Sequence, residues 1–369
     1  MTILYFFKDI PIPMYQWQHV HIFDELERHG CSITVFNPLD YSTQHAANEE
    51  LISYIKRNKF DLFMTPHGHE DIFGETILAI KKIGIPTLLI CFDNLIVPFM
   101  HEKNANYFDL VWLTSKETVD IFRKKCSNYL ILPYAANPYY FTPKYEKEIN
   151  KITFVGTPYG SRKNGINKLV ENGIDVCLYA NLESKNIANR QHIRPKNLIK
   201  TAYNLSRFKI GQRVLLGAIK HKIFTISELK LDSHYLEIKP SIDFSELNYL
   251  FSNFSISLSF TEARNTGVLK APVSVVNLRS FEIPMCGGLQ FCTYYDELAN
   301  YFTEDKEIIF YRNDEELISK AKFYLQPENE RIRMKIKTSA RKRAENEHTW
   351  FCRFLKVFEN LGLSGKYYK

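Results

Sequence analysis

Several short motifs that would indicate a particular chemistry are absent from the 369-residue sequence. Its seven cysteines are widely spaced, with no Cys-x-x-Cys pair, so we expect neither a disulfide framework nor a zinc site. No apolar run approaches the length of a membrane span, so any membrane contact should be peripheral. Gly-x-Ser-x-Gly and Walker sequences are also missing, which argues against a nucleophile elbow and a phosphate-binding P-loop.

What the sequence does contain is an ordinary globular composition. It has 45% hydrophobic and 24% charged residues, with a formal net charge of +7. The length exceeds what a single hydrophobic core usually supports, so we expect two domains. The scattered cysteines fit a reduced, cytoplasmic setting.

Short apolar runs alternate with helical patterns over the first 132 residues. The expected strands are Ile3–Phe7, Ser32–Phe36, Asp61–Met64, Thr87–Cys91, Leu110–Leu113 and Tyr129–Leu132. Because Ile3–Phe7 is apolar throughout, we expect it to be buried on both faces. Strands that alternate with helices in this way predict a parallel, doubly wound sheet of the α/β class.

The stretch from Pro133 to about Asn150 contains three prolines and no clear periodicity, and we expect it to link two domains. After it the alternating pattern restarts. The expected strands are Ile152–Val155, Val176–Tyr179, Ile256–Phe260, Leu289–Cys292 and Ile308–Tyr311, and the expected late helices are Asp314–Leu325, about Glu328–Glu345 and about Thr349–Asn360. This predicts a second α/β domain.

Residues 184–227 depart from the alternation. They contain ten Lys or Arg, two His and no Asp or Glu, with apolar residues at helical spacing. The pattern predicts a basic amphipathic insertion. Such a surface would bind anionic lipid, or it would be a solvated basic face over an ordinary packed helix, and the sequence does not decide between them. Nucleic acid is a weaker third alternative, because aromatic residues are sparse and no recognition motif is present.

One later stretch reads Asn-Leu-Arg-Ser-Phe-Glu-Ile-Pro-Met-Cys-Gly-Gly. Its polar residues Asn277, Arg279 and Glu282 lie beside an apolar, helix-like turn, which Gly287 and Gly288 end. In open α/β sheets, ligands bind where such loops gather at the strand ends. An acidic side chain there can accept hydrogen bonds from a ribose, and an arginine can hold a diphosphate.

This stretch resembles the donor-site signature of group 1 glycosyltransferases, in particular of the CgeB-like spore maturation proteins. Three further resemblances lie in the same order as in that family: Phe154-Val155-Gly156-Thr157 with Arg162, Glu307–Tyr311 with Asp314–Leu317, and His348-Thr349-Trp350 with Arg353. Together they cover roughly the C-terminal half of the chain. The resemblance implies the GT-B fold: two doubly wound Rossmann-like domains with a cleft between them and a C-terminal helix that crosses back.

The expected domains follow from this resemblance and from the strand pattern. Residues 1–145 would form the acceptor-side domain and residues 146–347 the nucleotide-sugar domain. Residues 348–369 would form the crossover helix and tail. The basic helical insertion would occupy about 184–240 within the second domain.

The resemblance assigns donor binding to residues of the second domain, namely Gly156, Arg162, Asn277, Arg279, Glu282, Gly287 and Gly288. Glu282 corresponds to the glutamate that binds the ribose in retaining enzymes; the alternative is an acid placed for the helix dipole. The wider group often has another glutamate eight positions earlier, where this chain has Ser274, so the donor-sugar contact lacks its usual residue. Arg162 or Arg279 would neutralise the departing diphosphate, and we therefore expect no metal or other cofactor.

His67 and Asp93 follow strands of the first domain and are the candidate catalytic residues. His67-Gly68 resembles a His-Gly pair in the wider group, and this histidine would act as a base or bind the acceptor. His67 and His69 also suggest a metal pair, but no clear third ligand is nearby. Asp93 would be a base or an acceptor ligand, with a plain Asx-turn before Asn94 as the alternative.

The resemblance implies transfer of a sugar from a nucleotide-sugar donor to a glycan or a lipid-linked envelope acceptor, with retention of configuration and without a metal. Residues 184–227 would bring the enzyme to the inner face of the cytoplasmic membrane. Two alternatives stay open. One is a sugar-nucleotide 2-epimerase on the same fold, and the other is a non-enzymatic protein that binds membranes or polyanions.

Overall fold

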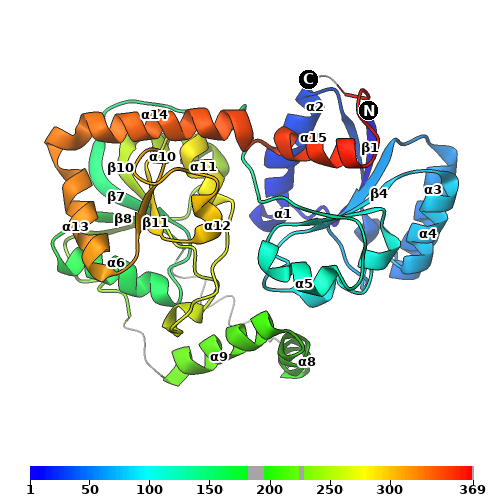
Figure 1. Ribbon diagram of the computed structural model, residues 1–369, viewed down its shortest axis with the longest axis horizontal. Helices are drawn as coiled ribbons and strands as arrows, with labels where there is room; N and C mark the ends of the chain where they lie inside the picture. The colour runs from blue at the N-terminus through cyan, green and yellow to red at the C-terminus, as the bar shows by residue number, and fades with distance from the viewer. Residues whose placement is uncertain (182–194, 224–227, 368–369) are drawn as a thin grey trace. The chain divides into compact units, whose positions relative to one another are not determined.

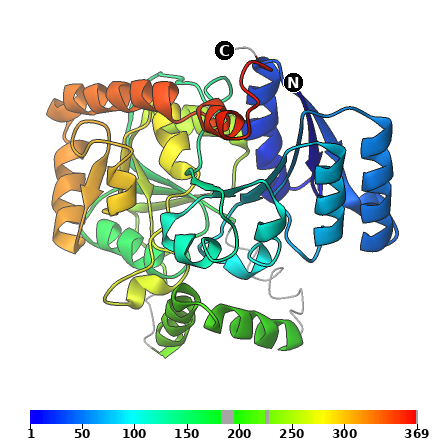
Figure 2. The same cartoon turned by 45° about the vertical axis from the view of Figure 1, so that its right-hand side comes forward.

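The computed structural model describes residues 1–181, 195–223 and 228–367, and the chain forms two compact units (Figures 1 and 2). Unit 1 comprises Met1–Asn137 and Thr349–Lys369, and unit 2 comprises Pro138–His348. The domain boundaries expected at residues 145 and 347 stay predictions, because compactness alone does not show which segment folds by itself. No helix among the described residues is long and apolar enough to cross a membrane.

Unit 1 is built on a six-stranded sheet in the order β2-β1-β3-β4-β5-β6, and every neighbouring pair is parallel. The strands are β1 (Thr2–Phe6), β2 (Ser32–Phe36), β3 (Leu62–Thr65), β4 (Thr87–Cys91), β5 (Leu110–Leu113) and β6 (Tyr129–Ile131). All of β3, β4 and β5 is buried, as expected for apolar strands covered on both faces. The chain winds in opposite directions on either side of the β1–β3 pair, which makes this pair the switch point of the sheet.

The helices of unit 1 cover both faces of this sheet. They are α1 (Pro13–Gln18), α2 (Asp24–Arg28), α3 (Gln44–Arg57), α4 (Gly74–Ile83), α5 (Val119–Phe122) and α15 (Trp350–Asn360), with a π-helical turn η1 (His19–Phe23) and short 3-10 turns η2 (Pro38–Asp40), η3 (Pro98–Met100), η4 (Ala105–Tyr107) and η5 (Lys116–Thr118). Helices α3 and α4 lie side by side in both ribbon views (Figures 1 and 2). Their apolar residues pack on β1, β3 and β4 in one core.

The last helix, α15, belongs to unit 1 although it follows unit 2 in the chain. A buried carboxylate fixes its first turn. The Oε1 and Oε2 atoms of Glu25 accept the N–H groups of Phe351 at 2.8 Å and of Trp350 at 3.1 Å. The Trp350 indole is fully buried and donates to Nδ1 of His21 at 3.1 Å. These bonds satisfy N–H groups that a helix start leaves without intrahelical partners.

Burial of Glu25 predicts a pH-dependent stability. Burial raises the pKa of this carboxyl to about 8 from its usual 4.5, against the lowering effect of the hydrogen bonds from Phe351, Thr349 and Trp350. At a pH between 4.5 and about 8, the Glu25 carboxyl is protonated in the folded chain and ionised in the unfolded chain. The free energy of unfolding should therefore fall as the pH rises from 5 to 8, by at most about 1.4 kcal/mol per pH unit from this group.

Thermal melts of the native chain and of Glu25→Gln between pH 5 and pH 8 would measure this effect. The glutamine of the variant cannot titrate. The amount by which the Tm of the variant lies below that of the native chain should therefore shrink as the pH rises. Glu27→Gln, on the exposed side of the same helix, serves as the control. Parallel curves for the native chain and Glu25→Gln would contradict the prediction.

Unit 2 contains a second parallel sheet, in the order β12-β11-β10-β7-β8-β9. Its strands are β7 (Ile149–Val155), β8 (Val176–Tyr179), β9 (Leu236–Lys239), β10 (Phe254–Ser259), β11 (Gln290–Thr293) and β12 (Ile309–Tyr311). Strand β9 was not predicted, because its residues fell within the helical insertion expected at about 184–240. The structure places it at the sheet edge, paired with β8. The switch point of this sheet lies between β7 and β10.

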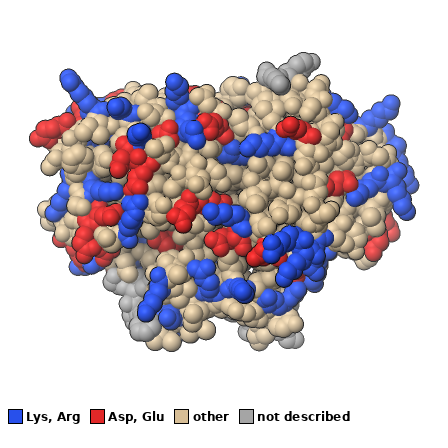
Figure 3. Space-filling model, viewed as in Figure 1, with Lys and Arg blue, Asp and Glu red and all other residues tan. Residues whose placement is uncertain are grey.

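The helices of unit 2 are α6 (Ser161–Glu171), α8 (Pro195–Ser206), α9 (Lys209–Ile223), α10 (Phe244–Asn253), α11 (Arg279–Met285), α12 (Asp296–Ala299), α13 (Asp314–Leu325) and α14 (Glu330–Glu347), with 3-10 turns η6 (Thr266–Val268) and η7 (Pro327–Asn329). Helices α8 and α9 are the described part of the predicted basic insertion, and Figure 3 shows Lys and Arg side chains on them. Residues 182–194 and 224–227 of that insertion lie outside the described residues.

Helix α14 is held to the amino end of β7 by a buried charge cluster. The Arg333 side chain is 1% exposed, and its guanidinium forms an ion pair with Glu148. The Lys337 ammonium lies 3.7 Å from the same carboxylate and donates to the carbonyls of Ser252 and Phe254, each at 2.9 Å. Burial lowers the pKa of Lys337 to about 8, against the raising effect of Glu148. Two buried cations thus depend on one carboxylate.

Candidate functional site

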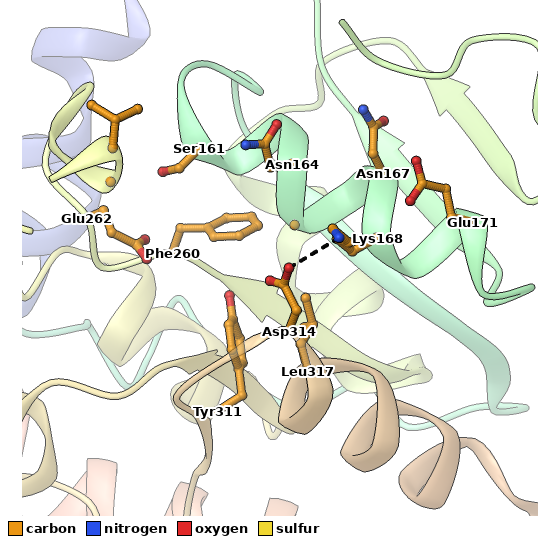
Figure 4. Close-up of a pocket in the computed structure, with 13 residues that line it drawn as sticks. Ser161, Asn164, Asn167, Lys168, Glu171, Phe260, Glu262, Tyr311, Asp314 and Leu317 are labelled. Atoms are coloured by element: carbon orange, nitrogen blue, oxygen red, sulfur yellow. Dashed lines mark ion pairs between the residues drawn. The ribbon is translucent and has the colours of Figure 1, made fainter. Parts of the chain in front are cut away.

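The carboxyl edge of the unit 2 sheet has a pocket of about 580 Å³ beside the switch point. Figure 4 shows side chains of α6 on one side of it and Tyr311 and Asp314 on the other. An ion pair between Lys168 of α6 and Asp314 of α13, at 3.4 Å, links the two sides. Ligands of open α/β sheets bind at such switch points, so this edge is the candidate site of unit 2.

The loop between β7 and α6 requires glycine at two positions. Gly156 has φ +144° and Gly160 has φ +57°, conformations that residues with a side chain rarely adopt. A Cβ at Gly160 would also lie 3.1 Å from the carbonyl oxygen of Arg264. The loop therefore packs closely against the segment that follows β10, and it brings the start of α6 to the switch point.

Arg162, in the first turn of α6, is a partly buried cation that lacks an ion-pair partner among the described residues. Its guanidinium lies 4.1 Å from the centre of the Tyr159 ring, and its NH1 donates to the Thr157 carbonyl at 3.3 Å. Its Nε is buried and has no hydrogen-bond acceptor among the described residues. Burial lowers the pKa of Arg162, although Tyr159 and Glu262 act in the opposite direction. A desolvated cation with an unused donor is suited to bind an anion.

Glu262 lies after β10 and lines the pocket (Figure 4). Its Oε1 accepts the hydroxyl of Thr293 at 3.0 Å, whereas its Oε2 is buried and has no hydrogen-bond donor in the described part of the chain. The backbone of Glu262 forms an antiparallel bridge with Ser274. The hairpin between these residues therefore brings the Glu262 carboxylate beside Ser274, where the wider glycosyltransferase group often has a glutamate. Glu262 was not predicted as a site residue; its one signal in the sequence is an acid two residues beyond the end of the predicted strand Ile256–Phe260.

A chain of hydrogen bonds orients the Glu262 carboxylate. The Tyr311 and Thr293 hydroxyls are 3.2 Å apart, and Thr293 in turn bonds to Glu262. Thr293 and Tyr311 are the last residues of β11 and β12 and are partners in the sheet register. Burial, followed by the charge of Glu262, raises the pKa of Tyr311, so its hydroxyl keeps its proton and donates. Three strand ends therefore position one carboxylate, and its second oxygen faces no donor.

The motif residues Asn277, Arg279 and Glu282 lie together at the start of α11. The amide of Asn277 donates to the Phe260 carbonyl at 3.4 Å, which ties the motif to the end of β10. Arg279 forms an ion pair with Glu282, whose side chain is fully buried. In this conformation the carboxylate predicted to bind the ribose is bonded to the arginine predicted to bind the diphosphate.

Gly287 and Gly288 have packing roles. Gly287 has φ +69°, and a Cβ there would lie 2.2 Å from the Tyr145 hydroxyl. A Cβ at Gly288 would lie 2.8 Å from the carbonyl oxygen of Phe251. Both glycines thus permit a close approach of protein atoms, and their predicted contact with a donor stays a prediction.

Comparison with known proteins shows which proteins the chain resembles. Residues 190–358 match the family model described as glycosyl transferase-like. Three similar solved structures are HepE from Anabaena in complex with UDP and glucose (TM-score 0.60, 10% identity, 98% of this chain and 99% of that chain), a glycosyltransferase from Rickettsia africae (0.60, 11%, 99% of each) and AviGT4, involved in avilamycin A biosynthesis (0.55, 12%, 100% of each). The chain has the GT-B fold of these glycosyltransferases. Its predicted GT-B fold is thereby confirmed, whereas no curated protein sequence matches it.

In unit 1, both ring nitrogens of His67 form polar contacts at the β1–β3 switch point. Its Nε2 accepts the Lys8 N–H at 3.0 Å, and its Nδ1 lies 3.1 Å from the Asp71 carboxylate. Asp71 also binds the Lys8 ammonium at 2.6 Å. Burial raises the pKa of Asp71, but the bonds from His67 and Lys8 outweigh it and lower the pKa from its usual value. His67 can act as a base only if the Lys8 N–H is displaced.

Asp93 is an exposed residue of the loop after β4, with φ +53°. Its Oδ1 accepts the Tyr134 hydroxyl at 3.0 Å, so its side chain bonds to another loop and does not form the plain Asx-turn considered above. His69 bonds through Nδ1 to the Met100 carbonyl at 3.2 Å. Among the described residues, no group of three or more His, Cys, Asp or Glu side chains is arranged to hold a metal ion.

Proposed function

We propose that this protein is a glycosyltransferase that uses a nucleoside diphosphate sugar, and that the switch point of unit 2 holds this donor. One observation carries the proposal: in the segments that follow the adjacent strands β7 and β10, Arg162 has a buried donor and Glu262 a buried acceptor with no partner among the described residues. The Glu262 charge acts on Arg162, yet no ion pair joins them among the described residues. A ligand that carries both a diphosphate and sugar hydroxyls would satisfy both groups.

In this proposal each residue has a defined role. Arg162 binds the diphosphate and stabilises the negative charge that develops on it as the sugar leaves. The free oxygen of Glu262 accepts a hydroxyl of the donor sugar, and Thr293 and Tyr311 hold the carboxylate in place. Glu282 would accept the ribose hydroxyls once Arg279 turns to the diphosphate. The solved structures of HepE with UDP-glucose and with UDP support this donor class.

Unit 1 would bind the acceptor, a glycan or a lipid-linked sugar, near His67 and Asp93. We propose a reaction that retains configuration and in which arginine neutralises the diphosphate without a metal. None of the seven cysteines, all of which lie among the described residues, forms a disulfide, which supports a reducing compartment, the cytoplasm, as the site of the reaction.

A thermal-shift experiment tests the donor site. We expect one nucleoside diphosphate among UDP, GDP and dTDP, and its sugar conjugate, to raise the Tm, because a ligand at 100 times its Kd stabilises the native state by about 2.7 kcal/mol. In Glu262→Gln, the shift with the nucleoside diphosphate should persist, and the extra shift from the sugar should be lost. This split is expected because Glu262 is assigned to the sugar and Arg162 to the phosphates.

Glu315→Gln, an exposed acid on α13, is the matched control and should keep both shifts. No shift with any nucleotide would contradict the donor site. Equal sugar-dependent Tm shifts in Glu262→Gln and the native chain would still support the donor site, but would show that Glu262 does not bind the sugar. Consumption of the donor sugar without any acceptor would favour the epimerase alternative.

A further inference from the structure

Helix α9 has two apolar faces on opposite sides. One face is buried in unit 2: Ile210 and Val214 are 7% and 5% exposed, and a Cβ at Gly217 would lie only 3.0 Å from Thr266 of η6. The other face carries Leu216, Ile219 and Ile223, spaced three and four residues apart, which places them on one side of the helix. Burial of the first face explains why α9 packs against unit 2. This packing does not explain why the second face is apolar.

The second face is uncovered. Leu216, Ile219 and Ile223 are 46%, 59% and 67% exposed. Helix α8 adds Ile199 and Tyr203, one helical turn apart and 70% and 68% exposed. Single exposed apolar residues are normal on a protein surface, but an apolar stripe along a helix marks a surface that binds something.

The charges around these side chains have one sign. Helices α8 and α9 pack against each other as a helical hairpin, residues 195–223. Its Lys and Arg residues with described side chains are Lys200, Arg207, Lys209, Arg213, Lys220 and Lys222. Residues 195–223 contain no Asp or Glu at all. In Figure 3, blue side chains flank a tan surface on this part of unit 2. Lys220 and Lys222 lie next to Ile219 and Ile223 in the helix, so charge and apolar surface are combined within one turn.

We propose that the α8–α9 hairpin docks the enzyme on an anionic lipid surface. Apolar side chains would enter the boundary between headgroups and acyl chains while the flanking cations meet the lipid phosphates, as in amphipathic helices that lie in a membrane interface. A second copy of this chain fits poorly, because the two hairpins would bring like charges together. Nucleic acid would use the cations but would leave the aliphatic stripe exposed. The proposal is independent of the donor chemistry proposed above.

Sedimentation of the full chain with vesicles tests this surface. We expect binding to vesicles with about one-third phosphatidylglycerol, little binding to pure phosphatidylcholine, and weaker binding as salt rises. The triple variant Leu216→Gln, Ile219→Gln, Ile223→Gln should partition at least about tenfold less, because it keeps every charge and loses the inserted apolar area. These side chains are exposed, so the variant should fold as the native chain does.

The matched control is the triple variant Leu39→Gln, Ile83→Gln, Ile332→Gln, which removes side chains of the same kinds that are 52%, 41% and 42% exposed elsewhere. It should bind vesicles as the native chain does. Undiminished binding by the α9 variant, or equal binding to neutral vesicles, would overturn the proposal.

A dimer in light scattering that the α9 variant abolishes would assign the exposed apolar face of α9 to a second copy instead. Tighter binding to duplex oligonucleotides than to vesicles would assign the surface to nucleic acid. A nucleotide thermal shift that persists in the variant separates this surface from the donor site.

Discussion

Arg162→Gln is expected to lower kcat/KM for sugar transfer by about 100- to 1,000-fold, the usual effect of removing one group that stabilises developing charge. The same substitution should leave the Tm unchanged or raise it. The Arg162 guanidinium is desolvated, which lowers its pKa, and it forms no ion pair among the described residues. A charge held in this way costs stability, so its removal relieves the folded state while it disables the site.

Initial rates and melting curves of Arg162→Gln, measured side by side, would check this prediction. Arg264→Gln is the control, because it removes an exposed arginine from the neighbouring loop after β10. It should change neither the rate nor the Tm appreciably. A large loss of Tm in Arg162→Gln, with activity lost in proportion, would instead show that Arg162 is a structural residue.

Glu148→Gln is expected to destabilise the enzyme by about 3–5 kcal/mol, which should appear in urea unfolding as a lower midpoint. Glu148 is the carboxylate that Arg333 and Lys337 share. Its loss would leave two buried cations without an anion. Burial raises the pKa of Glu148, and its bonds to Arg333 and Lys337 outweigh this effect and lower the pKa, so it is charged throughout the neutral range.

Two further variants make this prediction specific. Glu237→Gln also removes a carboxylate shared by two cations, Lys151 and Lys239, but this group is 44% exposed, and the loss should be below about 1 kcal/mol. Adding Lys337→Met to Glu148→Gln should restore part of the lost stability, because it removes one uncompensated charge. Equal losses in Glu148→Gln and Glu237→Gln would contradict the burial argument.

Most strands were predictable because burial leaves a local pattern in the sequence. The apolar run Thr87–Cys91 is β4 to the residue, and Asp314–Leu325 is α13 to the residue. Strand β9 was missed because an edge strand keeps polar residues: Glu237 and Lys239 stand within it and extend the charged stretch that precedes it. The local sequence pattern therefore predicts the central strands of a sheet better than its edge strands.

The site was less predictable than the fold, because its contacts join residues far apart in the chain. Arg162 follows a recognisable strand and glycine loop, and the sequence singled it out. Glu262 has no motif of its own; it reaches the site because a hairpin pairs it with Ser274 and because Thr293 bonds to it. The Lys8 N–H that occupies His67 depends on the pairing of β1 with β3, which no single stretch of sequence reveals.

The place of α15 in unit 1 has a consequence for the biosynthesis of this enzyme. Residues 1–137 leave the ribosome before unit 2, but the helix that covers Glu25 and buries Trp350 follows unit 2 in the chain. All of unit 2 is therefore synthesised before this helix. Unit 1 begins before unit 2 and is completed after it, and until α15 has left the ribosome it must keep a partly open core away from other nascent chains.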